Sequence, residues 1–220
     1  MVNDGYHHGD LRAALVEAAL EALERDGELP SWRGLARTCG VSQSAPYRHF
    51  ASLDALRVAV VVEGFRRLTE AIDAAKAREV DPFARLAAGT RAYIEFGRRN
   101  RALYGLMFRL GSDAMRDRDA AAAGQAAFAT LVEALGRCGV RDTLRAALVT
   151  WTAQHGIVDM IRAGLHPALG DADAIVEPTL EMIVGYVRGV LAAEQAGAAA
   201  PARVRAPAPA PRRPAKKRRP

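Results

Sequence analysis

The chain has 220 residues and two cysteines; half of its residues are apolar but only 6% are aromatic, and its formal net charge is +6. This length allows one large or two small domains, and no apolar run suits a membrane span or a secretory signal. Because Cys39 and Cys138 are far apart and have no metal-ligand spacing, we expect a reduced, cytoplasmic protein without membrane contact.

The positive charge is concentrated near the C-terminus. Residues 195–220 contain eight basic side chains and no acid, so the rest of the chain carries a formal charge of −2. Residues 197–220 are rich in Ala, Pro and Arg, which predicts a disordered basic tail. Such a tail could add non-specific DNA affinity through counterion release, or it could serve only solubility.

Abundant Ala and Leu, and the absence of any stretch that alternates with period two, predict an all-α fold of about nine helices. After a flexible arm, Asp10 is expected to cap a first helix from Leu11 to about Asp26, and Gly27 ends it.

Residues 31–50 have the pattern of a DNA-binding helix-turn-helix. A first short helix is predicted from Trp32 to Cys39, followed by a turn at Gly40, where glycine can adopt positive φ. A second short helix should follow, capped by Ser42 or Ser44. A helix, a glycine turn and a second helix that begins with small polar residues form the motif that reads a major groove.

The charge of this segment supports that interpretation, because Arg33, Arg37 and Arg48 lie between residues 31 and 53 without any acid. Pro46 could either touch a thymine methyl group or simply shape the turn. The residues that we expect to contact DNA are Ser31, Arg33, Ser42, Gln43, Ser44, Ala45, Pro46, Tyr47, Arg48 and His49.

A long helix capped by Ser52 should then lead away to about Ala77. The later helices are expected at Asp81–Pro82 to about Arg99, at 102–110, at Ser112 or Asp113 to about Arg137, at Asp142 to about Gly164, and at Asp171 or Asp173 to near Ala196.

The order of these elements, with Gly40-Val41-Ser42 and Tyr47-Arg48-His49-Phe50, resembles the TetR (tetracycline-repressor-like) family of bacterial regulators, and the opening residues 6–12 are similar to one branch of it. Leu53 stands where the family usually has a lysine that contacts phosphate. The resulting division is a DNA-binding domain at 1–60, a helical effector and dimerisation domain at 61–196, and the tail at 197–220.

In the second half, Trp151 with His155-Gly156 resembles the ligand-domain motif of one TetR subgroup. The resemblance implies a pocket for a small, apolar effector, and its candidate residues are Tyr93, Phe96, Met107, Phe108, Trp151 and His155. Taken singly, these side chains are also what an ordinary helical core contains. The last two helices, with Gly156, Gly185 and Gly189, are expected to form a homodimer face.

The sequence does not indicate a catalytic or metal site. His155 and Asp159 are spaced i,i+4, but no third ligand accompanies them, so we expect no catalytic residue, no metal and no cofactor. The sequence therefore predicts a ligand-responsive, sequence-specific regulator, most simply a repressor, that binds a near-palindromic DNA operator as a homodimer at the bacterial nucleoid. The alternatives are a non-specific nucleoid-associated protein that binds DNA through the tail, and an α-bundle enzyme.

Overall fold

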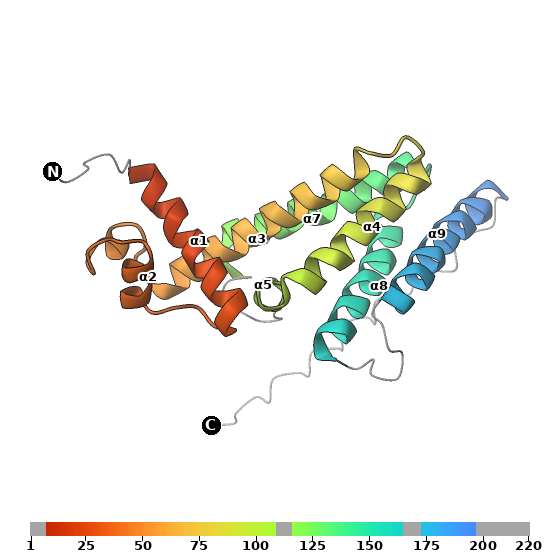
Figure 1. Cartoon of the computed structure of the whole chain (residues 1–220). Coiled ribbons are helices and arrows are strands. Elements are labelled where there is room, and N and C mark those ends of the chain that lie inside the picture. The colour runs from red at the N-terminus through yellow and green to blue at the C-terminus, as the bar shows by residue number, and fades with distance from the viewer. Residues whose placement is uncertain (1–7, 109–115, 165–172, 197–220) are drawn as a thin grey trace, which may run out of the picture.

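The computed structural model describes residues 8–108, 116–164 and 173–196, and every regular element within these ranges is helical, which confirms the all-α prediction. Figure 1 shows the N-terminal helices gathered at one end of the long helix α3, with the later helices packed beyond them. In chain order the elements are α1 (His8–Asp26), α2 (Trp32–Thr38), η1 (Pro46–Arg48), α3 (Leu53–Lys76), α4 (Pro82–Arg99), α5 (Arg101–Met107), α7 (Arg118–Arg137), α8 (Thr143–Ala163) and α9 (Asp173–Gln195).

Most helix starts follow the predicted caps. The side chains of Ser52, Asp81 and Asp142 each accept a hydrogen bond from the backbone N–H three residues later, at 3.1, 2.8 and 3.3 Å. Each cap satisfies a donor that the helix cannot pair internally. The starts of α3, α4 and α8 are therefore local properties of the sequence.

The start of the first helix differs from the prediction. Helix α1 begins at His8, so Asp10 lies inside its first turn rather than before it. Helix α7 begins at Arg118, where the carboxylate of Asp117 accepts from the Asp119 N–H at 2.8 Å. The predicted caps Ser112 and Asp113 lie outside the described residues.

The body of the protein is organised along α3, which packs against both α4 and α7, while α8 and α9 pack on α4 and on each other. Glycines allow two close approaches: a Cβ on Gly97 of α4 would overlap Val158 of α8, and a Cβ on Gly64 of α3 would lie 2.7 Å from the Met107 sulfur of α5. Gly97 therefore lets α8 pack closely on α4, and Gly64 lets α5 pack closely on α3. No described helix combines the length and the apolar content needed to cross a membrane.

Candidate nucleic-acid interface and ligand cavity

The segment predicted as the second helix of the helix-turn-helix is a single 3-10 turn, η1, rather than an α-helix. Its bonds run from Arg48 N to the Ala45 carbonyl (3.1 Å) and from His49 N to the Pro46 carbonyl (3.0 Å). Neither serine caps it: the N-cap is Ala45, and the hydroxyls of Ser42 and Ser44 lie 3.2 Å from each other. The segment between Gly40 and Ser52 is short, and Pro46 contributes no backbone donor, so a longer helical ladder does not form.

Most of the predicted DNA-contact side chains lie on the surface of this turn. Arg33, Ser42, Gln43, Ser44 and Arg48 are exposed, while Ala45 and His49 are half-buried. This exposure is compatible with contacts to phosphate or base edges.

Three of the predicted DNA-contact residues have structural environments of their own. The hydroxyl of Ser31 accepts from the Gly34 N–H at 3.2 Å and so caps α2. Pro46 is buried, which favours the interpretation that it shapes the turn. Tyr47 is 59% exposed, although one face of its ring is covered.

Trp32, which the sequence analysis did not single out, positions that ring. Its indole lies 5.3 Å from the Tyr47 ring and 6.5 Å from the buried Phe50 ring, measured between centroids. Arg12 of α1 adds a guanidinium 4.9 Å above Phe50. The aromatic contacts hold Tyr47 from behind and leave its outer edge available. The signal in the sequence was an aromatic residue at the first position of a short helix.

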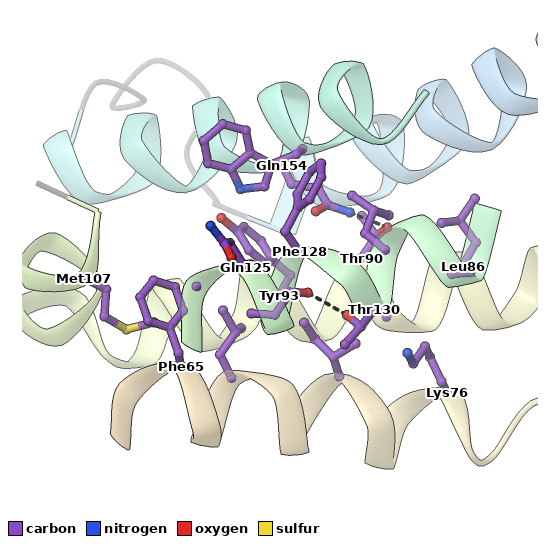
Figure 2. A pocket seen from close by; sticks show the side chains of 18 of the residues that line it. Phe65, Lys76, Leu86, Thr90, Tyr93, Met107, Gln125, Phe128, Thr130 and Gln154 are labelled. Atoms are coloured by element: carbon purple, nitrogen blue, oxygen red, sulfur yellow. Dashed lines mark hydrogen bonds between the residues drawn. The ribbon is translucent and has the colours of Figure 1, made fainter. Parts of the chain in front are cut away.

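The larger feature of the body is a cavity of about 480 Å³ between α3, α4, α7 and α8, with the C-terminal end of α5 at one end (Figure 2). Its lining residues are Phe65, Leu68, Ile72, Lys76, Arg85, Leu86, Gly89, Thr90, Tyr93, Met107, Phe108, Ala121, Gly124, Gln125, Ala127, Phe128, Thr130, Leu131, Ala134, Leu148, Trp151 and Gln154. A volume of this size suits a small organic molecule.

Of the six predicted pocket residues, Tyr93, Met107, Phe108 and Trp151 line the cavity. Phe96 is buried in the core near the cavity but is not among the described lining residues. His155 lies behind the wall, stacked against the indole of Trp151 at a centroid distance of 5.1 Å. The sequence therefore indicated the aromatic part of the lining but not the contribution of α7, whose small residues carry no distinctive pattern.

A buried polar chain runs from the cavity wall to the surface of α8. The hydroxyls of Tyr93 and Tyr104 are 2.8 Å apart, the Tyr104 hydroxyl is 2.7 Å from His155 Nδ1, and His155 Nε2 is 3.4 Å from Asp159. Burial raises the pKa of both tyrosines far above their ordinary value. Burial also lowers the pKa of His155, against the smaller opposing effect of Asp159. The net effect favours the neutral imidazole.

Helix α5 links the cavity to the N-terminal helices. Its C-terminal residues Met107 and Phe108 line the cavity, while at its N-terminus Glu24 of α1 accepts from the N–H groups of Ala102 (3.3 Å) and Leu103 (2.7 Å). Glu24 thus caps a helix that is distant in the sequence. One short helix therefore joins the inner end of the cavity to α1.

Among the described residues, no three His, Cys, Asp or Glu side chains approach closely enough to hold a metal ion. The described chain thus combines an exposed basic turn at one end of α3 with a largely apolar cavity along its length.

Comparison with known proteins agrees with this arrangement. A family model described as a tetracyclin repressor-like C-terminal domain matches residues 86–183. No curated protein matches the sequence.

Among solved structures, a protein of unknown function from Rhodococcus sp. RHA1 is 32% identical, with a TM-score of 0.72, and the alignment covers 83% of this chain and 97% of that one. A putative transcriptional regulator from Pseudomonas aeruginosa PAO1 is 20% identical (TM-score 0.64; 87% and 96% covered). SCO4454, a TetR-family transcriptional regulator from Streptomyces coelicolor, is 19% identical (TM-score 0.63; 83% and 96% covered). At these lower identities the likeness extends to the fold.

Proposed function

The chain belongs to the TetR family of transcriptional regulators, and from that premise we propose that it is a homodimeric repressor that releases its DNA operator when a small molecule enters the cavity. One observation carries the proposal: α3 begins directly after the basic turn η1 and then forms a wall of the cavity. A change in the cavity can therefore move the DNA-contacting turn through a single continuous helix.

The side chains proposed to meet DNA are those exposed around η1, above all Arg48, Arg33 and Tyr47. In a dimer, two such turns would enter successive major grooves about 34 Å apart on a near-palindromic site. Leu53, at the start of α3, offers no charge to a phosphate. The affinity for DNA should therefore depend strongly on the DNA-binding heads (residues 1–60) of both protomers binding together.

The proposed dimer face is the outer surface of α8 and α9. Large apolar side chains are exposed there, and Gly156, Gly185 and Gly189 have open space where a Cβ would stand. The exposed side chains are Leu144, Val149, Met160 and Met182. Exposed apolar surface of this kind is typical of a partner interface, and two helices from each protomer would form a four-helix bundle.

Effector response requires that the ligand bind one arrangement of the heads better than another. We propose that a ligand in contact with Met107 and Phe108 displaces α5, and that α5 acts on the head through Glu24 and through its packing on Gly64 of α3. The spacing of the two heads would then no longer match the operator.

The test is binding of the full chain to the DNA upstream of its own gene and to random DNA at moderate salt. We expect preference for the upstream fragment by about a thousandfold or more. Arg48→Ala should weaken binding and reduce the salt dependence by about one phosphate contact, whereas Arg137→Ala on α7 should change neither. Equal affinity for both DNAs would show that the protein is not a sequence-specific regulator.

A further inference from the structure

The cavity extends along α3. Phe65, Leu68, Ile72 and Lys76 line it from one face of that helix, at spacings of three and four residues. The helix rises by about 16 Å from Phe65 to Lys76. A lining of this length can accommodate an extended molecule.

The inner end and the middle of this cavity are largely apolar. Phe65 and Met107 lie at the inner end, nearest the N-terminal helices (Figure 2), and the Phe108 ring is 5.4 Å from the Phe65 ring between centroids. In the middle, two polar side chains are already paired: Gln154 Nε2 donates to Thr90 Oγ1 at 2.8 Å, and Thr130 Oγ1 donates to the Ala127 carbonyl at 2.9 Å. Gln125 adds an amide to the same lining. These walls favour a ligand whose middle part is apolar.

The outer end is cationic. Lys76 is only 8% exposed, and a Cβ on Gly89 would lie 3.3 Å from its Cγ, so the glycine leaves room for the lysine stem. Within the described residues, the ammonium forms an ion pair with Asp73 (2.8 Å), which leaves some of its three N–H donors for a ligand.

Arg85 lines the same end and donates to the backbone carbonyl of Glu79 at 3.0 Å. The nearby Arg137 and Glu133 form an ion pair at 2.8 Å, so together they add no net charge to this end. Two cations therefore face one acid, Asp73, whose carboxylate is half exposed to solvent.

We propose that the cavity binds an elongated apolar molecule with a single anionic group, its charged end at Lys76 and Arg85 and its apolar end against Phe65, Met107 and Phe108. This inference rests on the proposed role of the cavity as the effector site, and it names the class of effector. An anion at the outer end gains charge-assisted hydrogen bonds from a partly desolvated lysine. The apolar end is then the part that reaches α5.

The experiment compares three straight-chain probes of equal length: dodecanoate, dodecan-1-ol and dodecyltrimethylammonium. Binding to the full chain is measured by isothermal titration calorimetry, below the concentrations at which the probes form micelles and without DNA. We expect dodecanoate to bind about tenfold or more tightly than the alcohol, and the cationic probe to bind most weakly.

Matched variants locate the charged end. Lys76→Met and Arg85→Met keep much of the side-chain bulk but remove the charge, and each should bring the carboxylate and the alcohol to within about threefold of each other. Lys76→Arg should keep the preference. Arg99→Met removes an exposed charge from the opposite end of α4 and should leave the preference unchanged.

Several results would overturn the inference: no binding of any probe, equal binding of the acid and the alcohol, or a preference that persists in both Met variants. A Met variant that fails to fold is identified by its circular dichroism, and the decision then passes to Lys76→Arg and to the other Met variant. Because calorimetry uses no DNA, failure of operator binding or release would contradict the proposed function and not this assignment of ligand class.

Discussion

Two opposing effects act on the pKa of the His155 imidazole. Burial lowers the pKa, Asp159 raises it, and burial is the larger effect. The hydroxyl of Tyr104 lies 2.7 Å from Nδ1 and joins the imidazole to the buried tyrosine pair. The native state therefore prefers neutral His155, and the polar chain behind the cavity wall depends on that preference.

This preference predicts a pH dependence of stability. The unfolded chain takes up a proton near pH 6.5, whereas folded His155 resists it, so the free energy of unfolding should fall as pH drops from about 7 through about 6. The fall for this group should be at most about 1.4 kcal/mol per pH unit and should stop once the folded imidazole is also protonated. Urea unfolding at a series of pH values measures it. His155→Gln should flatten the curve in this window; an unchanged slope would assign it to other groups.

The carboxylates that are paired with arginine act at lower pH. The pKa of Glu63 is lowered to about 2 by its hydrogen bonds with Arg66 and Arg67 on α3. Stability from such a group is present above its unfolded pKa and is lost only as pH falls through the folded value, so it does not obscure the histidine window.

At the scale of elements, α5 is a short helix that depends on its neighbours. Seven residues are too few to form a stable helix alone, and the Asn100 side chain at its N-cap makes no capping hydrogen bond. Glu24 of α1 supplies the acceptors for its first N–H groups, and Gly64 of α3 makes room for Met107. The helix is thus assembled by the packing of α1 and α3.

Removing this remote cap should loosen α5 selectively. Glu24→Ala leaves the Leu103 N–H without its 2.7 Å acceptor, and loss of a cap costs about 1 kcal/mol, or about fivefold faster amide exchange. Hydrogen–deuterium exchange of a peptide covering residues 100–108 measures this change. Glu21→Ala, an exposed change on the same helix, is the control and should leave α5 as it is. Unchanged exchange in Glu24→Ala would show that the cap from α1 does not stabilise α5.

At the scale of the whole molecule, the exposed apolar surface lies on one pair of helices. Met182 on α9 and Leu144 on α8 are both more than half exposed, although each would gain by burial. Elsewhere in the described chain the exposed large apolar side chains are isolated, at Tyr47, Leu53 and Val80, and the buried ones form two clusters. One cluster is centred on α3, and the other joins α8 and α9 to α4 and α7. The second cluster holds α8 and α9 together, so they present their outer surface as one rigid face.

A charge on this face should dissociate the proposed dimer. Met182→Glu would place an unpaired carboxylate in the interface and weaken dimerisation by about a hundredfold or more, since burying such a charge costs several kcal/mol. Sedimentation velocity at several concentrations measures the change, and operator affinity should fall with it. Val80→Glu adds the same charge at a 95% exposed residue between α3 and α4 and should remain dimeric. A Met182→Glu protein that sediments as a dimer would move the interface elsewhere.

The sequence by itself determined the helical fold, most helix ends and the family. Ser52, Asp81 and Asp142 could be recognised as caps because a cap acts on an N–H three residues away. The motif around Gly40 and Tyr47 was sufficient to indicate the TetR family, which the family model and the fold then supported.

Tertiary structure alone decided the rest. The 3-10 form of residues 46–48 shows that a helix-turn-helix pattern gives the order of the elements but not the length of the second helix. The burial of Lys76, the capping of α5 by Glu24 and the support of Tyr47 by Trp32 each join residues from different helices. Periodicity reports which face of a helix is apolar, but not which helix will cover it. A cavity is the space that several helices leave unfilled, so its shape and its one charged end exist only once the helices have packed.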